Sequence, residues 1–160
     1  MTFLLDTNVV SELRKIRTGK ADPGVVDWAI SVDAGVMFIS SITLHELERG
    51  VLLAERADPS QGVVLRHWLD FGVALAFDGR VLAVDGSISR YAATFLVPDP
   101  APFRDALIGA TAAVHGMAVV TRNEKDFVRL GGVDVVNPWR RPRSLGRRGR
   151  FRRGGGRMPG

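Results

Sequence analysis

Short apolar runs alternate with amphipathic segments along most of this chain. Runs typical of buried strands lie at 2–5, 36–39, 81–84, 118–121 and 133–136. Segments whose apolar residues recur at helical spacing lie at 8–17, 23–31, 42–57, 62–76, 88–96 and 103–115. Strands that alternate with helices in this way predict a three-layer α/β/α fold with a central, mostly parallel sheet of about five strands.

This pattern ends at Trp139, and we expect one folded domain over residues 1–139. A chain of 160 residues is long enough for one such domain with its own core. Residues 140–160 are mostly Arg, Gly and Pro and offer almost nothing to bury. We therefore expect this tail to be disordered.

The net charge of +5 is unevenly distributed along the chain. Residues 1–139 carry 13 Lys and Arg against 17 Asp and Glu, a net −4, whereas residues 140–160 carry nine Arg and no acid. The basic character therefore belongs to the tail, and it does not indicate that the domain itself binds nucleic acid. The tail could attract RNA non-specifically, or it could be an incidental extension.

Cysteine is absent, which excludes disulfides and thiolate metal sites and is compatible with a reducing compartment. No signal peptide is recognisable, and no apolar stretch approaches the ~20 residues of a membrane span. A cytoplasmic location without membrane contact is the default expectation.

Three acidic residues follow predicted strands or begin predicted helices. Asp6 comes directly after the run at 2–5, Glu46 lies one turn into the helix that follows 36–39, and Asp105 lies early in the helix at 103–115. Ligands of open α/β sheets bind outside the carboxyl ends of the strands. These positions therefore predict a functional site that contains several carboxylates.

Each acid also has a purely structural interpretation. Asp6 could cap the helix that follows it, and Asp105 could stabilise a helix terminus by ~0.3–1 kcal/mol. Glu46 could form an ion pair with Arg49 at i+3, an interaction of ~0.2–0.5 kcal/mol. A residue that caps a helix can still point its side chain into a cleft, so the two interpretations are compatible.

Asn123 follows the strand predicted at 118–121 and is the fourth candidate site residue. It could also begin a short helix, with Asp126 in its first turn. Carboxylates brought close together raise one another's pKa, and a divalent cation would hold them in the charged form. Oxygen ligands without cysteine favour Mg²⁺, with Mn²⁺ possible, over zinc.

The chain resembles the PIN-domain ribonuclease family, and within it the VapC and FitB-type toxins of bacterial toxin–antitoxin pairs. The resemblance rests on LLDTNVVSE at 4–12, ISSITLHEL at 39–47, DALI at 105–108, VTRN at 120–123 and NPW at 137–139. It covers residues 1–139. No single motif is specific, whereas their order and spacing together are.

The resemblance implies an Mg²⁺-dependent endoribonuclease with site residues Asp6, Glu46, Asp105 and Asn123. It implies that Asp6 and Asp105 bind the metal directly and that Glu46 helps to bind or orient water on the metal. The fourth position is often Asp in the family, and Asn123 departs from that pattern, which weakens the case for a second metal. Residues that could contact phosphate are Arg14, Lys15, Arg49, Arg104 and Arg122.

The resemblance also implies partners, namely an RNA substrate, a cognate antitoxin and a second copy of the chain in a homodimer. Two other functions remain open at this point. One is a catalytically silent module that binds RNA or a protein partner. The other is a haloacid-dehalogenase-like phosphatase with Asp6 as nucleophile, which is weaker because Asn8 replaces the second aspartate that such a site requires.

Overall fold

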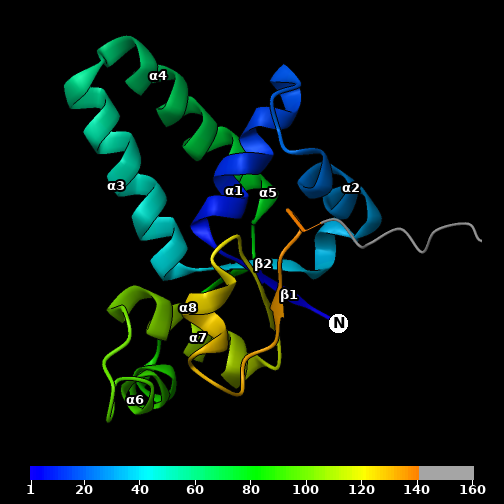
Figure 1. Ribbon diagram of the computed structural model, residues 1–160. Helices are drawn as coiled ribbons and strands as arrows, with labels where there is room; N and C mark the ends of the chain where they lie inside the picture. Colours follow the sequence, from blue (N-terminus) through cyan, green and yellow to red (C-terminus); the bar gives the residue numbers. More distant parts are fainter. Residues whose placement is uncertain (141–160) are drawn as a thin grey trace, which may run out of the picture.

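Five short parallel strands form the central sheet of residues 1–140, the part of the chain that the computed structural model describes (Figure 1). Their order is β3-β2-β1-β4-β5, and every neighbouring pair is parallel. The strands are β1 (Phe3–Leu5), β2 (Met37–Ser40), β3 (Val81–Leu82), β4 (Ala118–Val120) and β5 (Val135–Val136). The predicted parallel sheet of five strands is confirmed.

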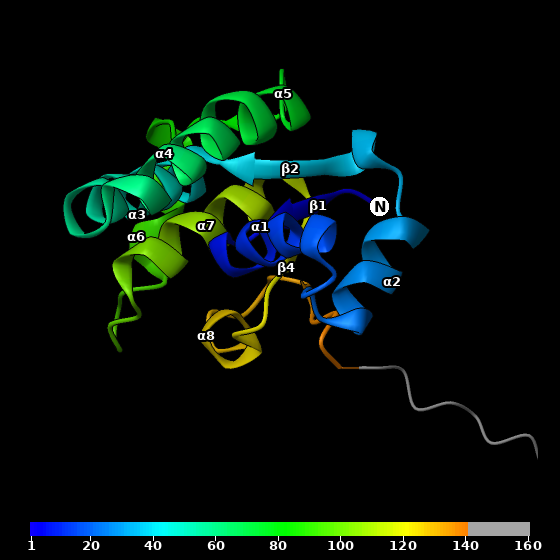
Figure 2. The same cartoon turned by 90° about the horizontal axis from the view of Figure 1, so that it is seen from above.

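Helices connect these strands and cover the sheet. Eight α-helices lie within residues 1–140: α1 (Thr7–Leu13), α2 (Pro23–Ser31), α3 (Ser41–Ala57), α4 (Pro59–His67), α5 (Ala74–Ala76), α6 (Gly86–Thr94), α7 (Phe103–His115) and α8 (Glu124–Val128). The chain also forms two short 3₁₀ helices, η1 (Arg14–Thr18) and η2 (Ala34–Val36), and one π-helical segment, η3 (Trp68–Val73). Figure 2 shows α5 near β2 and α8 near β4.

Alternate residues of the central strand face opposite layers of helices. Leu5 packs in one core with residues of α1, α3 and η3, such as Val9, Leu47 and Val73. Leu4 packs on the other face, against residues of α7 and α8. Because side chains alternate across a strand, two adjacent leucines secure two separate layers. This packing confirms the predicted α/β/α architecture.

The boundaries of α4, the second helix of the α3–α4 pair, differ from the prediction. The helix expected at 62–76 begins earlier, at Pro59, because the Asp58 side chain accepts hydrogen bonds from the backbone N–H groups of Ser60 and Gln61. It also widens into η3 before α5. In Figure 1, α3 and α4 run side by side and project from the rest of the molecule.

The helix expected at 8–17 is α-helical only to Leu13 and continues as the 3₁₀ turn η1, which ends at Gly19 in the left-handed conformation. The expectation for the tail concerns residues that, apart from Arg140, lie outside those described. Within the described part of the chain, no helix combines the length and apolar character needed to cross a membrane.

Candidate active site

The candidate site lies where the order of the sheet reverses. β2 lies on one side of β1 and β4 on the other, so the connection after β1 and the connection after β4 run in opposite directions. In open α/β sheets a crevice forms at such a point, outside the carboxyl ends of the strands. Leu5 pairs with Val120 in register, so the next residues, Asp6 and Thr121, meet at this point.

Asp6 is buried at the amino terminus of α1, with 6% of its surface exposed. Its carboxylate accepts hydrogen bonds from the Thr7 backbone N–H at 2.7 Å, Asn8 Nδ2 at 2.9 Å and Thr121 Oγ1 at 2.7 Å. Burial nevertheless raises the pKa of Asp6 above its ordinary value, and the charge of Glu46 adds to the rise. Asp6 also caps α1, so its structural interpretation is confirmed, while its role in a metal site stays a prediction.

Asp105 lies in the first turn of α7, close to the other acids. Burial, together with the charges of Asp6, Asp126 and Glu46, raises the pKa of Asp105 to about 6. The neighbouring Arg104 partly offsets this rise. The negative charge of these acids therefore exceeds the positive charge that Arg104 supplies.

Glu46 on α3 is held by two partners from other elements. Its Oε2 accepts a hydrogen bond from the Thr7 hydroxyl, and its Oε1 forms an ion pair with the Arg104 guanidinium of α7. The alternative ion pair with Arg49 is not among the salt bridges of residues 1–140. The structural interpretation of Glu46 was therefore wrong in its partner, because Glu46 pairs with Arg104 of α7 and not with a residue of its own helix.

Asn123 is linked to the site through its backbone, by way of Thr121. Its N–H donates to Thr121 Oγ1 at 3.0 Å, while its exposed side chain makes no capping bond to α8. Asp126, one turn further along and half-buried, is close enough to raise the pKa of Asp105. The catalytic role of Asn123 stays a prediction.

The donor set suits a hard divalent cation. A carboxylate has about four acceptor positions, and the three hydrogen bonds to Asp6 leave one for a metal. Within residues 1–140 no three acidic or histidine side chains are arranged to hold a metal as a group. The charge of Glu46 is already paired with Arg104, so Asp6 and Asp105 are the acids that fit direct ligation.

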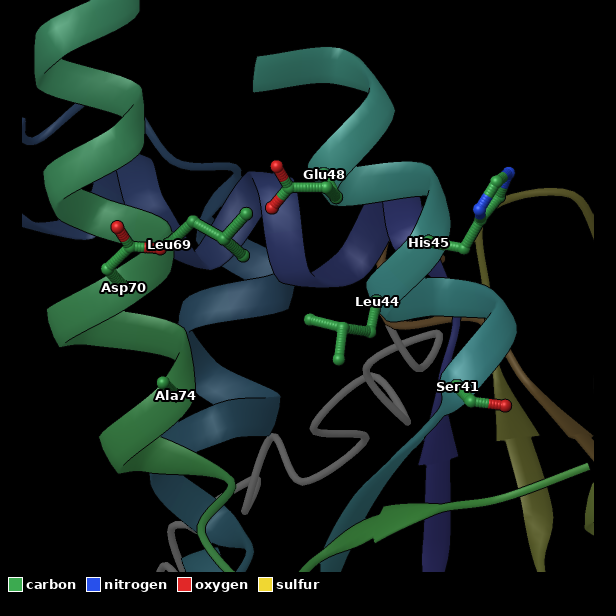
Figure 3. A pocket seen from close by; sticks show the side chains of 7 residues that line it. All are labelled: Ser41, Leu44, His45, Glu48, Leu69, Asp70 and Ala74. Atoms are coloured by element: carbon green, nitrogen blue, oxygen red, sulfur yellow. The ribbon is translucent and has the colours of Figure 1, made fainter. Parts of the chain in front are cut away.

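A separate open hollow of about 500 Å³ lies between α3 and the η3–α5 segment (Figure 3). Leu44 and Glu48 of α3 face Leu69 and Asp70 across it. Glu48 is also paired with Arg66 at 2.8 Å. None of the three predicted site acids lines this hollow, so it is distinct from the carboxylate site.

Two hydroxyl residues were not among the predicted site residues, although they orient the acids. Thr7 holds Glu46, and the buried Thr121 holds Asp6. Their signal in the sequence is a hydroxyl residue within two positions of the end of a strand. Such a signal is weak, because threonine also caps helices and fits strands.

Comparison with known proteins identifies the family. A model of the PIN domain matches residues 3–133. Ribonuclease VapC14 of Mycobacterium tuberculosis is 48% identical over 77 residues, which span 48% of this chain and 72% of the relative. Toxin FitB of Neisseria gonorrhoeae is 34% identical over 144 residues, which span 86% of this chain and 98% of FitB.

The fold also matches solved structures. In the crystal structure of FitAcB from Neisseria gonorrhoeae, one chain superimposes with a TM-score of 0.76 at 31% identity, covering 86% of this chain and 99% of that one. The resemblance recognised in the sequence is therefore confirmed by both sequence and structure. This chain belongs to the PIN-domain family.

Proposed function

We propose that this protein is an Mg²⁺-dependent endoribonuclease and the toxin of a toxin–antitoxin pair. The observation that carries the proposal is the convergence of Asp6, Glu46 and Asp105 at the point where the sheet order reverses, with a pKa of about 6 at Asp105. Uncompensated carboxylates at such an edge are the ligands of a hard cation. Relatives named as ribonucleases and a toxin support the same assignment.

The reaction is hydrolysis of a phosphodiester bond in RNA. Water adds to phosphorus in line with the leaving 3′ oxygen, so the products carry a 5′-phosphate and a 3′-hydroxyl. Asp6 and Asp105 would hold the divalent cation, which would supply charge to stabilise the scissile phosphate and lower the pKa of the attacking water.

The residues around the acids keep this site in shape. Thr7, Asn8 and Thr121 fix the carboxylates of Asp6 and Glu46, so that little reorganisation is needed when a substrate binds. Because the site is rich in carboxylates, RNA affinity depends on the bound cation and on nearby arginines.

The partner belongs to the proposal as well. Structures similar to this chain include complexes named FitAB, FitAcB and VapBC, whose names pair a toxin with a second component. We propose that a small antitoxin binds this chain, that the chain forms a homodimer, and that the protein acts in the cytoplasm, where RNA is accessible. The absence of cysteine is compatible with that compartment.

The test uses the purified full chain with total cellular RNA. We expect cleavage in Mg²⁺, none in EDTA, and none with Asp105→Asn. The matched control is Asp78→Asn, which removes the same charge from an exposed turn. This turn precedes the amino-terminal end of β3, whereas the site lies at the carboxyl ends of the strands. Wild-type protein that does not cleave RNA in Mg²⁺, or Asp105→Asn protein that still does, would overturn the proposal.

The toxin role is tested separately in cells. Expression of the chain alone is expected to arrest growth, and co-expression of its antitoxin, to be sought as a small reading frame beside its gene, is expected to restore growth. Growth arrest that persists with Asp105→Asn would contradict a nuclease toxin, because that variant keeps the protein surface and removes one ligand.

A further inference from the structure

Arg104 occupies an unusual position at the candidate site. It directly precedes Asp105 in the first turn of α7, and its guanidinium is paired with Oε1 of Glu46. The other carboxylate oxygen of Glu46 is occupied by Thr7. In this arrangement each oxygen of Glu46 already accepts one hydrogen bond, and Arg104 compensates its charge.

The pair itself is asymmetric. The Arg104 side chain is 60% exposed, whereas that of Glu46 is 15% exposed. An exposed guanidinium gives up little when it leaves a carboxylate, because solvent screens such pairs and the long side chain regains freedom. The carboxylate stays behind, anchored by Thr7.

Three of the other predicted phosphate contacts are engaged with residues other than the site acids. The guanidinium of Arg122 lies over the Trp139 ring at 5.7 Å, that of Arg14 lies over Trp68 at 5.6 Å, and Lys15 is paired with Glu12 at 2.7 Å. Arg104 is the one that contacts a predicted site acid and also lowers the pKa of Asp105. Its charge therefore acts on the carboxylates directly.

We propose that Arg104 exchanges partners during the reaction, holding Glu46 in the metal-free protein and binding a phosphate of the RNA once a divalent cation occupies the site. This inference rests on the proposed function. The cation and the guanidinium compete for Glu46 and repel one another, so occupation of the site releases Arg104. A phosphate beside the cation then offers the planar fork of arginine two acceptor oxygens.

The exchange predicts opposite effects of one substitution on metal and RNA. In Arg104→Gln, Glu46 has lost its competing partner, so the Mg²⁺ concentration at the midpoint of the thermal shift falls by a factor of roughly two to five, which corresponds to an exposed ion pair. RNA binding in Mg²⁺ weakens, and the slope of log affinity against log salt decreases by about 0.7, the value for one phosphate contact on a single strand.

The experiment uses thermal unfolding without RNA, and anisotropy with a short labelled phosphorothioate RNA, chosen to slow cleavage. Arg104→Lys keeps the charge but loses the fork, and is expected to lie between wild type and Arg104→Gln. The control is Arg56→Gln, an exposed position ten residues further along α3 from Glu46, about 15 Å away. It should behave as wild type in both assays.

The outcomes separate this inference from the proposed function. An Arg104→Gln protein with an unchanged Mg²⁺ midpoint, or with an unchanged salt slope in Mg²⁺, overturns the exchange while wild-type cleavage stands. A salt slope that decreases equally in EDTA also overturns it, because Arg104 would then contact RNA without release from Glu46. Wild-type protein without any Mg²⁺ response would overturn both.

Discussion

Thr121 Oγ1 donates a hydrogen bond to Asp6 Oδ2 at 2.7 Å, which joins two residues 115 positions apart in the chain. Both follow neighbouring strands, β1 and β4, at the point where the sheet order reverses. The bond thus ties the proposed metal ligand to the second strand of the crevice. This one contact therefore fixes where Asp6 lies relative to β4 and how its carboxylate is oriented.

Asp6→Asn is expected to stabilise the metal-free protein while it abolishes cleavage. Burial raises the pKa of Asp6, which means that the folded state disfavours the charged form at neutral pH. A neutral amide removes that cost, and we expect a gain of about 1 kcal/mol in the free energy of unfolding. Urea unfolding at pH 7.5 in EDTA measures it. A loss of stability would contradict this, and Asp78→Asn serves as the surface control.

Mg²⁺ is expected to raise the melting temperature of the wild-type protein. A cation bound only by the folded state adds about 1.4 kcal/mol at a concentration tenfold above its dissociation constant. Asp6→Asn and Asp105→Asn should lose this response, since each removes a proposed ligand, whereas Asp78→Asn should keep it. Differential scanning fluorimetry with and without Mg²⁺ measures the change in melting temperature. An equal change in all four proteins would show that Mg²⁺ binds non-specifically.

Glu12→Gln is expected to destabilise the protein in a pH-dependent way. The hydrogen bond from Lys15 holds the pKa of Glu12 below its ordinary value of 4.5. The stability contributed by ionised Glu12 is therefore complete above pH 4.5 and is lost as the pH falls through its folded-state pKa.

The glutamine keeps an acceptor for the Asp22 N–H but loses the charge. We expect a cost of about 1 kcal/mol at pH 7, with a smaller difference from wild type below pH ~4. Urea midpoints of both proteins at the two pH values measure it. A difference that does not depend on pH would show that packing, and not the ion pair with Lys15, is responsible.

Two glycine-to-alanine substitutions are expected to change the free energy of unfolding in opposite directions. A Cβ at Gly62 would lie 2.5 Å from the Glu55 Cα, where α4 crosses α3, so Gly62→Ala should cost about 1–3 kcal/mol. A Cβ at Gly50, within α3, would meet nothing within 4 Å. Gly50→Ala should therefore stabilise the protein by about 0.5–1 kcal/mol. Chemical unfolding compares the two, and destabilisation by both would contradict the close contact at Gly62.

The alternation of apolar runs and helical segments by itself determined the layers of this protein. Leu4 and Leu5 must both be buried, and a strand can do that only between two layers of helices. The acids at strand ends followed from the same pattern, since Asp6 begins where the buried run stops. The helix boundaries at Pro59 and Leu13 were harder to predict from the pattern, because they depend on a cap and on turn geometry.

Only the tertiary structure decided which side chains meet. Glu46 pairs with Arg104, 58 positions away, although Arg49 is close in sequence. Thr121 reaches Asp6 because β4 lies beside β1, and nothing in the local pattern states the order of the strands. Periodicity reports whether a residue is buried, whereas hydrogen bonds and ion pairs require atoms within about 3–4 Å. That proximity arises from the packing of distant segments, and it is what makes separate acids into a site.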